Sequence, residues 1–251
     1  MALDKRTFVH EYLERIEYTG DTAPTLENLY AMQIQHIYAV PFENLDILAG
    51  IPVSLDYECL FHRIVTLRRG GVCYELNRSF YNLLSALGYR VDYISGQVRM
   101  GGTLLDHALS LVHLEEGDFA VDVGFGDNVL PPVLLRHASR RDAFGWIYTV
   151  AQQGELFHLL RRQPGQLPQR MYTLTTVPRS IEDVMGRFRR AATPGNSPYS
   201  RYHVCTWERP DGRFSLIGQT FTVEKNGVTT VFPAKTQTEC AQYLREYFDL
   251  P

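Results

Sequence analysis

Three residues that could act together in nucleophilic catalysis lie in the first half of the chain: Cys73, His107 and Asp122. A thiol attacks best as the thiolate, and an imidazole oriented by a carboxylate is well suited to generate it. Cys73 follows two glycines and precedes an apolar stripe with helical spacing, which predicts that it stands at or just inside the start of a helix. Backbone N–H groups and the positive end of the helix dipole favour the thiolate there.

Each of these residues also has an ordinary structural interpretation. A cysteine taken alone is more often a small buried residue than a nucleophile, and a lone strand histidine is more often structural than a base. The combination favours chemistry, because Asp122 lies between Val121 and Val123 in an apolar run, where a buried carboxylate needs a partner. The chain has eight histidines, and none of the other seven has a comparable acidic partner in the sequence pattern.

The strands around His107 and Asp122 decide whether their side chains meet. Strands are expected over 90–100, 108–114 and 119–125, and a turn over 115–118. An even-numbered hairpin loop places His107 and Asp122 on one face of the sheet. A turn centred on residues 116–117 would still leave them about 13 Å apart, at about 3.3 Å per residue. Contact therefore requires a turn centred nearer 114–115, or a bulge.

The remaining patterns predict an α+β protein of three parts. Amphipathic helices fill the first third, period-two strands fill the middle third as an antiparallel sheet or barrel, and the turn-rich segment 191–198 opens the last part. Three strands follow, joined by turns over 210–213 and 225–228, the second of which contains the hairpin pair Asn226-Gly227. A final helix begins with the Thr236 and Glu239 capping pattern. The predicted domains are a helical bundle over 1–88, a β-barrel over 89–190 and an α/β lid over 191–251.

Composition argues against several functional classes. The chain has 251 residues, a formal net charge of -3 and 45% hydrophobic residues, which suggests neither a nucleic-acid nor a membrane surface. Its four cysteines form no C-x-x-C pair, so no zinc site or disulfide framework is expected. The first residues lack the apolar core of a signal peptide, and a cytoplasmic enzyme without a metal is expected.

Five blocks, in this order along the chain, resemble the motifs of the arylamine N-acetyltransferases. Together they span most of the sequence, and the second and fourth are highly specific in combination. They are V-P-F-E-N-L-D-I at 40–47, R-G-G-V-C-Y-E-L-N at 69–77, D-H-A at 106–108, V-D-V-G-F-G at 121–126 and N-S-P-Y-S-R-Y at 196–202.

The resemblance implies a helical bundle, a β-barrel and an α/β lid around a core like that of the papain-like cysteine proteases. It also implies that Cys73 takes an acetyl group from acetyl-coenzyme A and passes it to an arylamine, an arylhydrazine or an N-arylhydroxylamine by a ping-pong mechanism. His107 would be the base and later the acid, oriented by Asp122. The residues implied to line the cleft or the acceptor pocket are Phe42, Val98, Phe125 and Gly126.

Asp106 departs from the family pattern, which commonly has Thr or Ser before the histidine. A carboxylate there is expected to repel the phosphates of coenzyme A, unless it faces solvent or pairs with an arginine such as Arg99. The sequence has no Walker loop or G-x-G-x-x-G fingerprint to cradle those phosphates. Scattered basic residues and other donors must bind them instead.

Three other functions remain open. An amide synthase of the same family would close a polyketide chain, and the sequence does not exclude it. A cysteine amidase or peptidase would use the same triad without coenzyme A, which the 40–47 and 121–126 blocks argue against. A non-catalytic relative would have little reason to keep Cys73, His107 and Asp122 together.

Overall fold

Helices make up most of the N-terminal part of the molecule. The computed structural model describes residues 3–100, 103–127, 131–136, 139–142 and 145–251. Its first elements are α1 (Lys5–Arg15), α2 (Leu26–Ala39), α3 (Leu45–Leu48), α4 (Tyr57–Phe61), a short π-helical segment (His62–Thr66) and α5 (Cys73–Leu87).

Helix α5 begins at Cys73, as the sequence predicts. Its apolar stripe enters the largest hydrophobic core, where Leu76, Phe80 and Leu83 are completely buried. Gly88 ends the helix in the left-handed conformation, with φ of 91°, which a residue with a side chain rarely adopts. The nucleophile candidate therefore stands on a helix whose position is fixed by packing.

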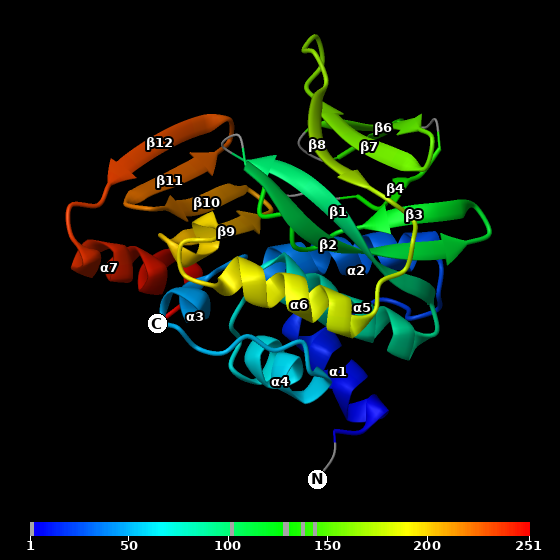
Figure 1. The fold of residues 1–251 in the computed structure, drawn as a ribbon, viewed down its shortest axis with the longest axis horizontal. Helices are drawn as coiled ribbons and strands as arrows, with labels where there is room; N and C mark the ends of the chain where they lie inside the picture. Colours follow the sequence, from blue (N-terminus) through cyan, green and yellow to red (C-terminus); the bar gives the residue numbers. More distant parts are fainter. Residues whose placement is uncertain (1–2, 101–102, 128–130, 137–138, 143–144) are drawn as a thin grey trace.

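An eight-stranded antiparallel sheet follows the helices. Its spatial order is β4-β3-β2-β1-β8-β7-β6-β5, and contact between β4 and β6 curls it into a nearly closed, barrel-like shape (Figure 1). The predicted strand over 90–100 is confirmed. The strands are β1 (Arg90–Met100), β2 (Thr103–Leu114), β3 (Gly117–Val121), β4 (Val133–Leu134), β5 (Ser139–Arg141), β6 (Ile147–Gln153), β7 (Leu156–Arg162) and β8 (Gln169–Leu174).

The last part of the chain holds a second antiparallel sheet, covered by a helix. Four strands lie in the order β12-β11-β10-β9, one more than the three that the sequence predicts. Cys240, Leu244 and Phe248 of the final helix are buried against this sheet. The elements are β9 (Val204–Arg209), β10 (Gly212–Ile217), β11 (Thr220–Lys225), β12 (Val228–Pro233) and α7 (Gln237–Phe248).

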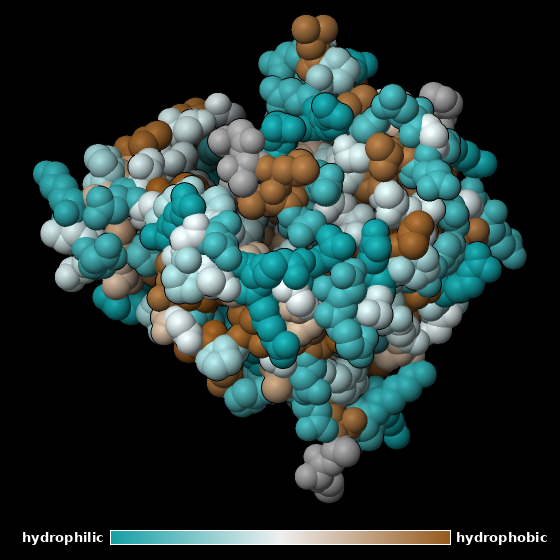
Figure 2. All heavy atoms as spheres, viewed as in Figure 1, coloured by the Kyte–Doolittle hydropathy of each residue, from teal (hydrophilic) through white to brown (hydrophobic). Residues whose placement is uncertain are grey.

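Helix α6 (Ile181–Ala192), which the sequence analysis did not predict, connects the two sheets together with the 3-10 turn Pro198–Ser200. In Figure 1 it runs across the molecule in front of α5. Phe188 on α6 stacks on Tyr74 of α5, with 4.8 Å between the ring centroids. Hydrophilic side chains predominate on this face in Figure 2, and most of the charged residues of α6 are exposed.

The predicted α+β class is confirmed, with helices and two antiparallel sheets in one chain. Among the described residues, no helix is long and apolar enough to cross a membrane.

The stack between α6 and α5 generates a stability prediction. Phe188 is fully buried, so Phe188→Ala leaves a cavity and should lower the free energy of unfolding by about 3–5 kcal/mol. Leu167→Ala is the control, because Leu167 is 88% exposed and its loss should change that energy by less than about 0.5 kcal/mol. Urea unfolding of both variants measures the difference, and equal midpoints would contradict the packing described.

Candidate active site

Cys73 is 2% exposed at the first turn of α5. The chain beyond β3 passes so close to this turn that only glycine fits. A Cβ atom added to Gly124 would lie 2.8 Å from the Cys73 Cα and 2.9 Å from the Asn77 side-chain nitrogen. The V-D-V-G motif thus brings the segment that contains Asp122 directly against the start of the helix.

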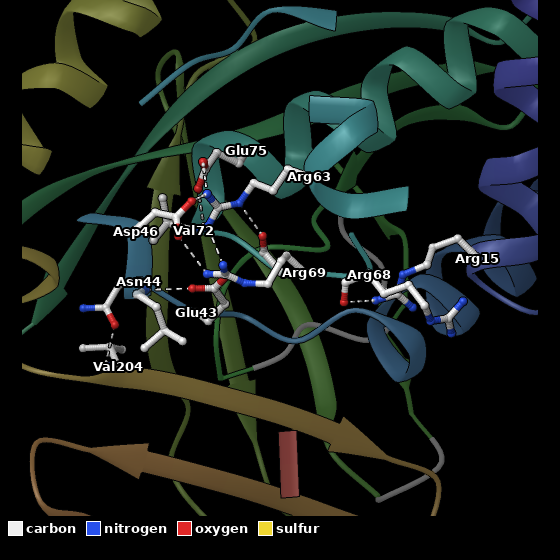
Figure 3. Close-up of polar contacts among 12 residues, drawn as sticks. Arg15, Glu43, Asn44, Asp46, Arg63, Arg68, Arg69, Val72, Glu75 and Val204 are labelled. Atoms are coloured by element: carbon white, nitrogen blue, oxygen red, sulfur yellow. Dashed lines mark hydrogen bonds and ion pairs between the residues drawn. The ribbon is translucent and has the colours of Figure 1, made fainter. Parts of the chain in front are cut away.

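Side chains from two elements hold the loop that leads into Cys73 (Figure 3). Arg63 donates from Nε to the Gly70 carbonyl at 2.7 Å. Glu75 accepts the Val72 N–H at 3.0 Å through Oε2, which satisfies one of the free amides at the helix start. The backbone around the thiol is therefore fixed on both sides.

Strand register brings His107 and Asp122 together in a way that the sequence analysis did not foresee. Leu114 pairs with Gly117, so the turn is centred on residues 115–116, between the two centres considered from sequence. If this register continued, Gly124 would lie opposite His107, and Asp122 would be two residues away from that point. Strand β3 instead ends at Val121, so Asp122 lies outside the strand. Departure from the strand, rather than a bulge, allows the carboxylate to reach the imidazole.

The Asp122 carboxylate is buried and has three donors. Its Oδ2 lies 2.7 Å from Nε2 of His107, and its Oδ1 accepts from Asn77 Nδ2 and from the Gly124 N–H, both at 2.9 Å. Asp122 is 1% exposed and His107 is 4% exposed. These bonds supply the partners that a buried carboxylate requires.

The electrostatics of the site favour the imidazolium. Burial opposes the charge on His107, but the charge and hydrogen bond of Asp122, followed by contact with Cys73, outweigh it and raise the pKa of His107 to about 10. The Cys73 thiol lies within hydrogen-bonding range of the imidazole, and Nε2 is occupied by Asp122, which leaves Nδ1 for the thiol. A proton that moves from sulfur to this ring creates a thiolate–imidazolium pair.

Beside His107 opens a cleft of about 300 Å³. The Phe125 ring packs edge-on against the His107 ring at 5.6 Å, and Tyr172 lies 5.3 Å from the same ring. Each residue that the sequence analysis assigned to substrate or coenzyme contributes to the lining: Phe42, Val98, Asp106, Phe125 and Gly126.

The surroundings of Asp106 modify the expectation from sequence. Asp106 forms an ion pair with Arg187 of α6, with 3.1 Å between Oδ1 and Nη1. Arg187 is 81 residues away in sequence, on a helix that was not predicted, so no local pattern could have identified this partner. The negative charge is therefore partly balanced, which weakens the expected repulsion of phosphates.

Sequence reasoning missed the role of Asn77 in the geometry of this site. Besides its bond to Asp122, Asn77 donates to the Ala108 carbonyl at 2.7 Å and accepts the Val123 N–H at 2.9 Å. It therefore joins α5 to β2 and to the segment after β3. Its spacing of four residues from Cys73 places both on one helix face, and that was a usable signal.

The raised pKa of His107 predicts an unusual pH dependence for alkylation. His107 should stay protonated at pH values well below about 10. An imidazolium beside a cysteine at the start of a helix favours attack by the sulfur as a thiolate. Iodoacetamide should then modify Cys73 at pH 6.5 nearly as fast as at pH 8.5. Rates from mass spectrometry for the native protein and His107→Gln decide this. A native rate that follows an ordinary thiol titration, unchanged in the variant, would show that no ion pair exists.

Comparison with known proteins agrees with this geometry. An N-acetyltransferase family model matches residues 25–251. The arylamine N-acetyltransferase of Mycolicibacterium smegmatis is 34% identical over 229 residues, covering 87% of this chain and 82% of that protein. Proansamycin X synthase of Amycolatopsis mediterranei is 33% identical over 192 residues, 70% of each chain. The arylamine N-acetyltransferase of Mycobacterium marinum, solved in complex with CoA, superimposes with a TM-score of 0.88 at 29% identity, covering 96% of this chain and 92% of that one.

The family model covers most of the chain, and the similar proteins align over most of their own length. Cys73 is buried at the start of α5, beside the buried His107–Asp122 pair. Together with this geometry, the comparisons establish that the chain belongs to the arylamine N-acetyltransferase family.

Proposed function

We propose that this protein transfers an acetyl group from acetyl-coenzyme A to the nitrogen of an arylamine, an arylhydrazine or an N-arylhydroxylamine. The observation that carries the proposal is the buried His107–Asp122 pair in contact with Cys73 at the start of α5. A thiolate–imidazolium pair is suited to acyl transfer, because the thiolate attacks and the ring supplies the proton that the leaving group needs.

The first half of the reaction acylates Cys73. Its thiolate attacks the acetyl carbonyl carbon of the donor, and the C–S bond to coenzyme A breaks. The coenzyme A sulfur takes the proton from Nδ1 of His107 and leaves as a thiol. His107 is then neutral, still oriented by Asp122, and the acetyl group is held as a thioester on Cys73.

The second half restores the starting state. The acceptor nitrogen attacks the Cys73 thioester, and neutral His107 takes the proton that the nitrogen loses. The C–S bond to Cys73 breaks, so the product amide and the thiolate–imidazolium pair are formed together. Donor and acceptor use the same cleft in turn, which explains why one triad suffices for both steps.

The charge of the cleft supports a polyanionic donor. Arginines outnumber aspartates in its lining. The arginines are Arg99, Arg161, Arg170 and Arg213, and the aspartates are Asp106 and Asp127. Asp127 forms ion pairs with both Arg161 and Arg213, at 2.7 and 2.6 Å. The excess of arginines over aspartates in this lining favours the binding of phosphate groups in the cleft. The apolar side chains of Phe42, Val98 and Phe125 in the same lining suit an aromatic acceptor.

Similarity to proansamycin X synthase favours a second candidate, an amide synthase that joins an amine to a larger acyl thioester. This enzyme would use the same thiolate and the same acylated cysteine. The two candidates differ in the acyl group that Cys73 accepts, and the cleft of about 300 Å³ is more easily matched to acetyl and a single aromatic ring than to a polyketide chain.

Acylation without an acceptor tests the proposal. Incubation with acetyl-coenzyme A should add one acetyl group to the intact protein, at Cys73, and Cys73→Ala should add none because the nucleophile is gone. With acceptor present, initial-rate lines at several donor concentrations should be parallel, as expected for a covalent intermediate. Intersecting lines without any trapped acetyl-enzyme would contradict it, and loading by a long-chain acyl thioester but not by acetyl-coenzyme A would favour the amide synthase.

A further inference from the structure

Five ionisable side chains near the start of α5 form a cluster that takes no part in the mechanism above. They are Glu43, Asp46, Arg63, Arg69 and Glu75 (Figure 3). Glu43 is completely buried, and its Oε1 accepts from Arg63 at 3.0 Å and from Arg69 at 2.8 Å. Asp46 also pairs with both arginines. The two guanidiniums are thus already matched by two carboxylates.

Glu75 is the third carboxyl of this cluster and is the least well paired. Its Oε1 forms only a long ion pair with Arg63 Nη1, at 3.6 Å, whereas Arg63 is hydrogen-bonded to both Glu43 and Asp46. The side chain of Glu75 is 5% exposed, so water does not screen it. With all five groups ionised the site would hold a net charge of -1, which is costly in a buried position.

The other oxygen of Glu75 acts on the nucleophile loop. Oε2 accepts the Val72 N–H at 3.0 Å, one residue before Cys73. Gly71 packs on the same carboxyl, because a Cβ atom added there would lie 2.9 Å from Oε2. A neutral carboxyl group accepts this hydrogen bond through its carbonyl oxygen, so the loop needs an acceptor at this point and does not need a charge.

We propose that Glu75 is a positioning residue for Cys73 that works as a neutral acceptor: it holds the Val72 N–H while its proton keeps the buried cluster electrically balanced. Ionisation of Glu75 adds an uncompensated negative charge beside the loop, and the backbone that positions Cys73 is then held less firmly. The inference rests on the proposed role of Cys73.

The balance of forces on Glu75 agrees with this assignment. Burial raises the pKa of Glu75, Arg63 and the Val72 N–H oppose that rise, and the charges of Glu43 and Asp46 add to it, which together bring the pKa to about 7. Beyond Glu43 lies Cys205 of β9, whose own pKa is raised by burial and by Glu43, so it adds no charge near neutral pH. Turnover should therefore fall as the pH rises through about 7, in a range where His107 is still protonated.

Replacement of Glu75 by glutamine separates charge from hydrogen bonding. Glu75→Gln keeps the acceptor oxygen and cannot ionise, so its turnover should hold constant from pH 7 to 9 while that of the native enzyme declines. Glu75→Ala removes the acceptor and should be slower at every pH. The matched control is Glu239→Gln, since Glu239 occupies the same third position of α7 and accepts the Lys235 N–H near the surface. Its pH profile should be native.

Thermal unfolding supplies a readout that does not depend on acetyl transfer. With a raised pKa, folded Glu75 keeps a proton that unfolded Glu75 loses above about 4.3, so native stability should fall between that pH and about 7 and then level off. Glu75→Gln lacks this fall, so its Tm relative to native should rise from pH 5 to pH 8. Alkylation of Cys73 at pH 7 should be slower in Glu75→Ala and restored in Glu75→Gln.

Three results would overturn the proposal: a native turnover that stays level from pH 7 to 9, a decline that persists in Glu75→Gln, or a Glu75→Gln protein less stable than native at pH 8. The last would mean that Glu75 works as an ionised partner of Arg63. If acetyl transfer is absent altogether, the Tm and alkylation series still decide the matter, and the proposed function fails separately.

Discussion

The bonds to the Asp122 carboxylate are the constraint on which the rest of the site depends. One carboxylate joins three parts of the chain: α5 through Asn77, β2 through His107 and the segment after β3 through the Gly124 N–H. Because each donor comes from a different element, a shift of any one leaves a buried charge with fewer partners, and that is costly. The early end of β3, the absence of a side chain at Gly124 and the close approach to Cys73 all follow from this one arrangement.

Two buried carboxyl groups, those of Asp122 and Glu75, flank the start of α5, and the site makes opposite demands on them. On the strand side, Asp122 accepts three hydrogen bonds and raises the pKa of His107. On the loop side, the arginines are already satisfied by Glu43 and Asp46, so further negative charge from Glu75 is unfavourable. Cys73 lies between Asp122, which supports a positive charge on His107, and Glu75, which works as a neutral acceptor. The field at the nucleophile depends on both.

Local patterns were enough to predict much of this arrangement. The apolar stripe and Gly88 defined α5, alternation defined β1, and the pairing of an acid in an apolar run with a histidine identified Asp122 and His107. The strand end at Val121 could not be predicted, since Val123 continues the alternation and the break is set by contacts of Asp122 in three dimensions. Helix α6 was missed although its sequence carries the signal: Ile181, Val184, Met185 and Phe188 follow the Ser180 cap at helical spacing and pack against the core. Its Arg187 then escaped notice as the partner of Asp106.

The central claim is that Asp122 holds His107 as an imidazolium in the free enzyme. Nitrogen-15 NMR of histidine-labelled protein tests it most directly, because the two ring nitrogens report separately whether each carries a proton. With His107→Gln to assign the signals, both nitrogens of His107 should remain protonated from pH 6 to pH 8, consistent with a pKa raised to about 10. A ring that is neutral at pH 7, with one unprotonated nitrogen, would contradict the account.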